Sequence, residues 1–342
     1  RLVHYLRDAA SLGVDPSALD EQALSTADRF CSWASLRYNE TDAPPRREAA
    51  ADLLKAEPNL VDTHVWAAAS AADPEAVTRH LAGRPELANT GGGPFGWVPL
   101  MYLCYSRVPS VRNAEDVLAT ATLLLDAGAD PNAGYLWCGL STPFTVLTGV
   151  FGEGEQGPRR QPRHPFSADL ATLLLTRGAH PVDQQTLYNR MFRADDSHLE
   201  LLFAHGLADA GPSPWEARLG EAMETRAQMW RRQVEWAAGH GFTHRLELLA
   251  RHGIDVSGVK VVLPAFPEDP DALDEQGATA LHQAAWSGDV ELIRRLLDAG
   301  ADATITDRRF GSTPLDWAEH AYQSEAAEVL RGALSAPSDH DG

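Results

Sequence analysis

Cysteine is scarce in this sequence: among 342 residues there are only Cys31, Cys104 and Cys138, and no two of them are close together. An odd, scattered set supports neither a disulfide framework nor a thiolate metal site, and it favours a reducing compartment, the cytoplasm. Long apolar runs are also missing. None approaches the roughly 18 residues that a membrane-spanning helix needs, so we expect no membrane association. The chain starts at Arg1 rather than Met, which indicates a trimmed or partial sequence.

Positive charge is scarce as well. The chain has 29 Lys and Arg against 48 Asp and Glu, a formal net charge of −19 with neutral histidines. Nucleic acids are bound mainly through basic groups that release counterions, so this balance predicts that nucleic acid is not a partner. A cationic or basic partner is favoured instead. Apolar residues make up 44% of the chain and charged residues 23%, which is typical of a folded protein.

Signatures of cofactor and metal chemistry are absent from the sequence. The run Gly91–Gly93 is followed by Pro94 and lacks the Lys-Ser/Thr pair that would reach phosphate and metal, so it indicates a turn. There is no His-Glu-x-x-His segment, no paired Cys motif and no Gly-x-Ser-x-Gly elbow. We therefore predict no cofactor and no metal, and we assign no catalytic residue.

What the sequence does contain is an internal repeat. The stretch DEQGATALHQAAWSGDVELIRRLLDAGADATIT begins at Asp274, and DRRFGSTPLDWAEHAYQSEAAEVLRGAL begins 33 residues later at Asp307. The turn of the second copy has one extra residue, so Gly277 and Gly311 are 34 residues apart. A period of this length is typical of proteins in which one supersecondary unit recurs along the chain.

Each copy has the pattern of two short antiparallel helices. Thr279 and Thr313-Pro314 are suited to open the first helix, with a capping hydroxyl and a proline at the first helical position. The apolar residues within 281–285 form one face at helical spacing, and the small alanines there let a second helix approach closely. The second helix has its apolar stripe within 292–297 and ends at Gly300, which can adopt the left-handed conformation.

The segment GATALHQAAWSGDVELIRRLLDAGAD resembles the ankyrin repeat closely, and looser copies upstream end at Gly128, Gly178, Gly206 and Gly253. The resemblance implies an all-α repeat solenoid of about seven helix-turn-helix units with short β-hairpin turns, here of a divergent, bacterial type. Neighbouring units must stack, because no unit can bury its apolar stripe alone. The resemblance also implies that His282 is structural and bonds threonine and backbone between units.

The predicted chain organisation has three parts. Residues 1–45 do not follow the repeat and are expected to form an N-terminal helical cap of two amphipathic helices, the second opened by Asp15-Pro16. Residues 46–334 form the ankyrin-repeat solenoid, and residues 335–342 form a flexible tail. Insertions lengthen the solenoid, and they fall near 106–115, 152–166, 211–230 and 258–270. Such insertions are either tolerated surface loops or parts of a binding site.

Candidate binding residues also come from the resemblance. In ankyrin-like units, the hairpin after the glycine and the two residues after the Ala-Ala pair face the concave groove. The positions in this sequence are Trp97, Tyr105, Phe192, Arg193, His240, Trp286, Ser287 and His320. Large aromatic rings give wide contact area at little cost in side-chain entropy, which suits recognition. By contrast, Trp66, Trp236 and Trp317 stand at packing positions.

The favoured function is a non-catalytic binding module of the cytoplasm that recognises a protein segment or compact ligand through a concave, aromatic, acidic groove. The alternative is a cofactor-independent enzyme of specialised metabolism, with a pocket roofed by the insertions and acid-base groups from His, Asp or Glu. A contact surface between copies of the chain is a third possibility, so the oligomeric state stays open. An open groove favours the first function, whereas an enclosed cavity with two convergent titratable groups favours the second.

Overall fold

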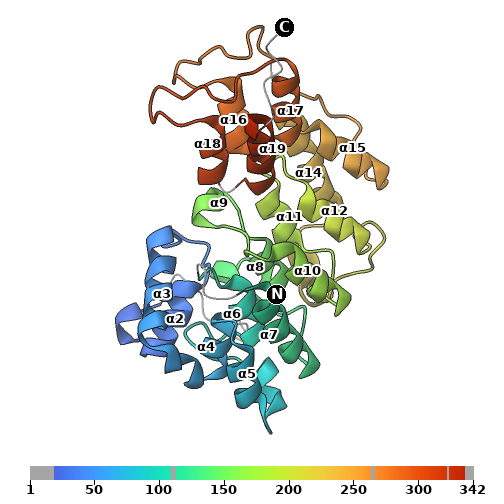
Figure 1. The fold of residues 1–342 in the computed structure, drawn as a ribbon. Helices are drawn as coiled ribbons and strands as arrows, with labels where there is room; N and C mark the ends of the chain where they lie inside the picture. Colours follow the sequence, from blue (N-terminus) through green and yellow to red (C-terminus); the bar gives the residue numbers. More distant parts are fainter. Residues whose placement is uncertain (1–18, 109–112, 263–265, 322, 336–342) are drawn as a thin grey trace. The chain divides into compact units, whose positions relative to one another are not determined.

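The computed structural model describes residues 19–108, 113–262, 266–321 and 323–335 (Figure 1). This part of the chain is mostly helical, with one two-stranded sheet. The chain divides into two compact units, and each is described by itself. Unit 1 comprises Arg1–Gln156, Arg160–Asn189 and Leu201–Met229, and unit 2 comprises Gly157–Arg159, Arg190–Glu200 and Trp230–Gly342.

Unit 1 is built from short helices and one β-hairpin. Its α-helices are α2 (Thr26–Ala34), α3 (Pro44–Ala56), α4 (Val65–Ser70), α5 (Pro74–Leu81), α6 (Pro99–Tyr105), α7 (Ala114–Asp126), α8 (Val146–Phe151), α10 (Ser167–Thr176) and α13 (Pro214–Leu219). Its 3-10 helices are η2 (Glu21–Ala23), η3 (Pro58–Asp62), η4 (Pro85–Asn89), η5 (Trp137–Gly139) and η6 (Gly220–Ala222). Strands β1 (Gly134–Leu136) and β2 (Pro143–Thr145) pair antiparallel, with Tyr135 opposite Phe144.

Unit 2 holds the C-terminal helices. They are α15 (Thr243–Arg251), α16 (Ala280–Ser287), α17 (Val290–Asp298), α18 (Pro314–His320) and α19 (Ser324–Ser335). Four helices have residues in both units, namely α9 (Gly157–Arg160), α11 (Gln184–Arg190), α12 (Ser197–Ala204) and α14 (Arg226–His240).

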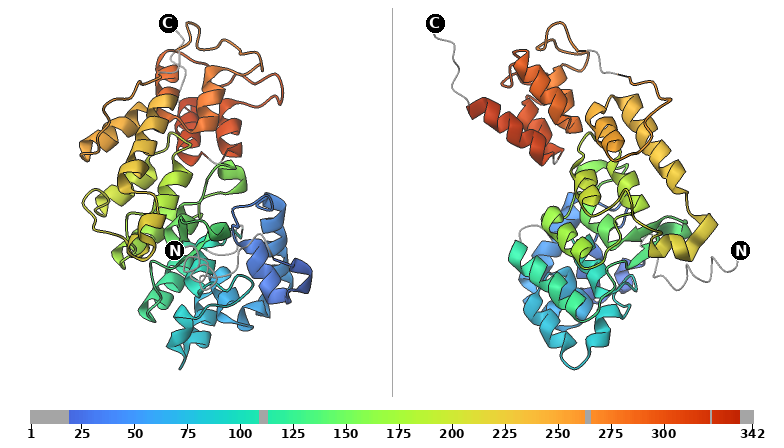
Figure 2. Two further views of the ribbon diagram at one scale, coloured as in Figure 1. Left: turned by 180° about the vertical axis from the view of Figure 1, so that it is seen from behind. Right: turned by 90° about the vertical axis from the view of Figure 1, so that its right-hand side faces the viewer.

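Lateral stacking of helix pairs builds the core of each unit. In unit 1, α4 contacts α5 and α6, and α6 contacts α7 and α8. In unit 2, α16 lies against α17 and α18, and α17 lies against α19, as both views in Figure 2 show. Buried alanines on α16 and α18 allow close approach, while Ile293 and Leu296 of α17 fill the space behind them. This is the packing of an α-repeat fold; the count of seven units stays a prediction.

The local structure of the clearest repeat is as predicted. The Thr279 hydroxyl caps α16 by accepting the His282 N–H, and Gly300, with φ of 90°, follows the end of α17. Leu281 is 1% exposed. His282 is fully buried, with Nδ1 at 2.8 Å from the Thr279 hydroxyl and Nε2 at 3.0 Å from the Ser312 carbonyl oxygen of the next turn. His282 therefore links two consecutive repeats.

The predicted N-terminal cap lies only partly within the described residues, since 1–18 fall outside them, as do 336–342 of the predicted tail. Helix α2 begins at Thr26, because the Ser25 hydroxyl accepts the Asp28 N–H and caps the helix there, and residues 24–25 before it are not helical. The predicted helix start at Asp15-Pro16 lies outside the described residues. Pro44 opens α3, where a proline loses no helical hydrogen bond. Helix α2 packs against both α3 and α4.

The predicted insertions contain local structure of their own. Residues 152–166 include α9, and residues 211–230 include α13, η6 and the first turn of α14. In the insertion near 258–270, the Val262 N–H donates to the Ala238 carbonyl of α14 at 2.8 Å, which attaches this segment to that helix. In the insertion near 106–115, residues 109–112 lie outside the described part of the chain.

Candidate functional site

Two of the predicted binding residues, Trp97 and Tyr105, lie inside unit 1. Trp97 is 3% exposed and Tyr105 is fully buried. The centroid of the Trp97 ring lies 4.5 Å from that of Phe95, 5.0 Å from Tyr105 and 4.9 Å from Tyr135. These rings form an aromatic core, in which each ring gains contact area from its neighbours. The expectation that Trp97 and Tyr105 stand exposed on an open groove is therefore corrected: both rings are almost wholly buried in this core.

The insertion near 211–230 covers the β1–β2 hairpin of unit 1. Trp215 of α13 is 8% exposed, and its indole N–H donates to the Asn132 carbonyl at 2.9 Å. Arg226 fixes this loop through two hydrogen bonds of 2.8 Å to the Glu216 carboxylate. A recess of about 330 Å³ remains between Trp97 and Trp215. Most of the β1–β2 hairpin surface in unit 1 is thus covered by the insertion near 211–230.

In the insertion near 152–166, the part that begins at Arg160 belongs to unit 1 and is held there by hydrogen bonds. The buried guanidinium of Arg107 donates to the Pro162 carbonyl at 2.8 Å, and the Gln161 amide donates to the Asp42 carboxylate at 3.3 Å. Burial lowers the pKa of Arg107 to about 10. These polar groups serve to hold the segment in place, so nothing in the described part of unit 1 favours the enzyme alternative.

In unit 2, Trp286 and His320 form an exposed aromatic pair. Trp286 is 38% exposed, His320 is exposed, and their ring centroids lie 6.0 Å apart with the planes inclined by 25°. The Trp317 ring meets Trp286 edge-on at 6.0 Å. Ser287 donates its hydroxyl to the Ala284 carbonyl at 3.0 Å and so belongs to the end of α16. The pair lies where α16 and α18 end.

Phe192 and His240 form a second group in unit 2, around Trp236. The Phe192 ring meets Trp236 edge-on with centroids 5.0 Å apart, and His240 stacks on Trp236 at 4.1 Å. Arg193 is half-buried, and its guanidinium lies close against Gly157. A Cβ atom at position 157 would be only 2.9 Å from Nη2 of Arg193. Trp236 was expected only at a packing position, yet it joins these two predicted residues into one cluster.

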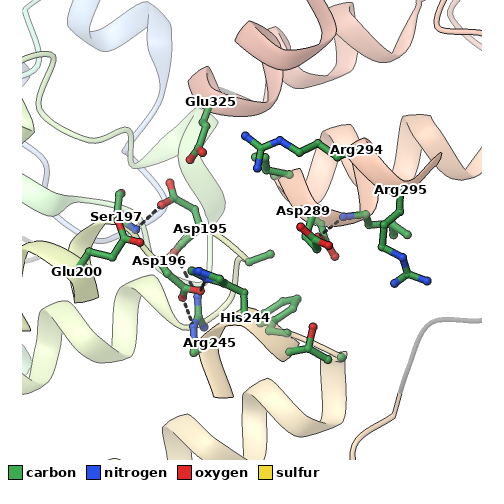
Figure 3. Close-up of a pocket in the computed structure, with 18 residues that line it drawn as sticks. Asp195, Asp196, Ser197, Glu200, His244, Arg245, Asp289, Arg294, Arg295 and Glu325 are labelled. Carbon is green, nitrogen blue, oxygen red and sulfur yellow. Dashed lines mark hydrogen bonds and ion pairs between the residues drawn. The ribbon is translucent and has the colours of Figure 1, made fainter. Parts of the chain in front are cut away.

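Unit 2 also contains a cavity (Figure 3). Along the sequence, the six predicted residues of this unit directly precede the segments that line the cavity or lie within a few residues of them. The cavity has a volume of about 270 Å³. It is lined by the turns and first residues of three helices, within 194–200 for α12, 241–245 for α15 and 288–295 for α17, and by Glu325 of α19. The N-terminal regions of three helices that are separate along the chain therefore contribute to one cavity.

One wall of the cavity is organised by a buried ion pair. The fully buried Arg245 side chain places Nε 2.5 Å from Oδ1 of Asp196, and it donates to the Met191 carbonyl at 2.8 Å. Oδ2 of Asp196 lies 3.0 Å from Nδ1 of His244, and this hydrogen bond raises the pKa of His244. Beside it, Arg190 and Asp195 form another buried pair with Nη2 and Oδ2 at 3.1 Å. Buried charges on this wall are therefore paired.

The opposite wall belongs to α17. Asp289 caps this helix by accepting the Leu292 N–H at 2.9 Å; burial raises the pKa of its carboxyl, against the lowering effect of that hydrogen bond. Figure 3 shows Arg294 and Glu325 reaching toward the cavity. The whole lining has six carboxylates, three guanidiniums and one imidazole. The cavity therefore carries an excess of negative charge, which favours a positively charged group.

Sequence reasoning missed the residues of this cavity. Asp289 carried a usable signal, because an acidic residue directly before an apolar helical pattern is typical of an N-cap. Nothing in the sequence indicates that Arg245 pairs with Asp196, 49 residues earlier.

No group of three or more His, Cys, Asp and Glu side chains in the described ranges is arranged to hold a metal ion. The same part of the chain contains no helix whose length and apolar character would let it cross a bilayer.

Stacked pairs of short helices, with a histidine joining consecutive turns, define an α-repeat protein. Comparison with known families gives the kind of repeat: residues 263–318 match the model for ankyrin repeats, described as occurring in many copies. The C-terminal part of this chain thus contains ankyrin repeats. A stretch of 91 residues, 25% of the chain, is 36% identical to diacylglycerol kinase zeta from Rattus norvegicus. The match spans only 10% of that kinase, so it does not bring the activity of the whole protein to this chain.

Proposed function

We propose that the chain is a protein-interaction module in which unit 2 binds a basic segment of a partner. Ankyrin repeats are typical of interaction modules, although a fold alone does not fix a function. The observation that carries the proposal is a cavity with excess carboxylates. In the same unit, the exposed Trp286 and His320 rings stack at the ends of α16 and α18. Rings of this kind give contact area and attract cations through their π faces.

The charges that line the cavity favour binding of a cationic group. With His244 neutral, six carboxylates and three guanidiniums give the lining a formal charge of −3, and Arg190, which pairs with the lining residue Asp195, brings the site to −2. The N-termini of α12, α15 and α17 offset part of this charge, at about half a positive charge each. The site then still has a net charge of about −0.5. Protonation of His244 reverses the sign of this charge, so we expect cations to bind best above the pKa of His244.

The size of the cavity favours a side chain over a whole small molecule. Sites for drug-sized ligands occupy roughly 300–1,000 Å³ and enclose most of the ligand. This cavity, at about 270 Å³, lies below that range. An Arg or Lys side chain could enter the cavity while flanking residues of the partner cover Trp286.

A peptide-library experiment tests this function. Random peptides selected on the immobilised full chain should be enriched in Arg and Lys, and a selected peptide is then titrated by calorimetry. Trp286→Ala should weaken binding on the order of 10-fold, as expected for an aromatic anchor. Leu140→Ala, which removes an exposed apolar side chain of unit 1, is the matched control and should bind like the unmodified protein. Selection without basic enrichment, or unchanged affinity for Trp286→Ala, would refute the proposal.

A further inference from the structure

The turn before α18 displays an aromatic side chain that the equivalent turn before α16 lacks. The earlier turn runs from Asp274 to the cap Thr279, and the later one from Asp307 to the cap Thr313, with one residue more. Phe310 lies in the lengthened turn and is 65% exposed, more than any other large apolar side chain in the described residues. The extra residue that breaks the 33-residue period therefore coincides with an exposed aromatic protrusion.

The protrusion is held in one conformation by Asp307. The Asp307 side chain accepts the N–H groups of Arg309 at 2.8 Å, Phe310 at 2.6 Å and Ser312 at 3.0 Å. It also accepts the indole N–H of Trp317 at 3.0 Å. Burial acts to raise the pKa of Asp307, but these hydrogen bonds outweigh it and lower the pKa to about 2. A turn fixed in this way loses little conformational entropy on binding.

The protrusion differs in charge from the rest of the chain. Arg308 and Arg309 are both exposed, and the Arg309 guanidinium carbon lies 4.9 Å from the centroid of the Phe310 ring. Neither guanidinium forms an ion pair within the described residues. Residues 308–310 thus form a cationic and aromatic tip on a chain whose formal charge is −19. Such a tip is complementary to an acidic recess with apolar contacts.

The cavity of unit 2 has this chemistry. Besides its excess of carboxylates, it is lined by Phe242, Val290 and Leu292. The tip directly precedes the start of α18, whereas the cavity is formed by residues that follow the ends of α16 and α18, among them Gly288 and Glu325. Tip and cavity lie at opposite ends of the same helices, so a molecule cannot place its tip in its own cavity.

We propose that the tip formed by residues 308–310 docks into the acidic cavity of a second copy of this chain. The inference rests on the proposed function, because the tip is then the basic segment that the cavity receives. The two contacting surfaces are different, so the interaction is head-to-tail and can continue from one copy to the next. Self-association should accordingly increase with concentration without stopping at a dimer.

Sedimentation of the full chain tests the proposal. At an ionic strength of about 0.15 M, the Debye length of about 8 Å screens the repulsion between whole acidic chains but not the close contact. The weight-average mass should rise above that of one chain, 37.1 kDa, as concentration increases. Phe310→Ala, and separately Arg308→Glu with Arg309→Glu, should weaken association at least about 10-fold. Gln276→Ala, in the shorter turn before α16, is the matched control and should associate normally.

A charge swap checks that the cavity receives the tip. Glu291→Arg with Glu325→Arg should abolish self-association, and mixing this protein with Arg308→Glu, Arg309→Glu should restore association, because the tip of each variant is opposite in charge to the cavity of the other. Circular dichroism confirms that each variant is folded. A mass that stays at one chain at every concentration, or association unaffected by the tip variants, overturns the inference. Basic peptides that still bind to a monomeric chain would then show that the proposed function stands without it.

Discussion

Replacing Arg245 by Met should remove the buried cation that organises one wall of the cavity. The Arg245 side chain is fully buried, and the side chain of its partner Asp196 is 3% exposed. Above the pKa of His244, the other nearby partner of Asp196, removing one member of this buried pair leaves the remaining charge uncompensated, which costs about 3–5 kcal/mol. Methionine has a similar volume and leaves little empty space. We therefore expect the free energy of unfolding to fall by about 3–5 kcal/mol.

The half-exposed pair of Arg331 and Glu319 provides the control. Its Nη2 and Oε1 atoms are 2.8 Å apart, but the two side chains are 55% and 49% exposed, so Arg331→Met should cost about 0–1 kcal/mol. Urea unfolding followed by circular dichroism and tryptophan fluorescence measures both losses. If Arg245→Met cost no more than Arg331→Met, burial would not set the strength of the pair and the reasoning would be refuted.

The pH dependence of the Arg245→Met variant gives a second readout. Asp196 raises the pKa of His244 above its ordinary value of 6.5, so this interaction stabilises the fold fully below that pH. The stabilisation is lost as pH rises through the folded-state pKa. In the variant, His244 is the remaining cationic partner of Asp196, so its stability should fall more steeply over this window than that of the unmodified protein.

Three further outcomes are expected. His244→Gln should remove the stability loss above pH 6.5 in urea unfolding, and it should remove the rise in affinity for basic peptides over the same window. Trp215→Ala should cost about 3–5 kcal/mol and make Trp97 more accessible to acrylamide quenching, because the covering loop loses its anchor. Glu216 has its pKa lowered to about 2 by its hydrogen bonds from Arg226, so it stabilises the fold above about pH 4.5 and the effect is lost toward pH 2. Glu216→Gln should flatten that part of an acid-unfolding curve, and an unchanged curve would contradict the assignment.

The helices of the clearest repeat could be predicted because their signals are local. The Thr279 cap, the apolar face around Leu281 and the glycine after α17 depend on residues a few positions apart. The link between His282 and Ser312 could be expected from the family pattern. The predicted N-terminal helix does not run without a break into α2, because residues 24–25 are not helical and the Ser25 hydroxyl caps a new helix at Thr26.

The candidate site could be predicted only in part. The repeat register placed Trp286 and His320 at equivalent positions, and the structure shows them exposed and stacked. The same register placed Trp97 on an open surface, where the structure buries it. The difference arises because the rings of Phe95, Tyr105 and Tyr135 pack around Trp97, and two of these rings come from later parts of the chain.

The sequence by itself thus determined the repeat period, the helix caps and apolar faces of the clearest repeat, and the acidic balance, since each follows from composition or from neighbours one or two turns away. The tertiary structure alone decided which aromatic rings stay exposed and which carboxylates gather around one cavity. Pairing Asp196 with Arg245 or covering the β1–β2 hairpin with Trp215 depends on contacts between distant segments, and no local pattern encodes such contacts.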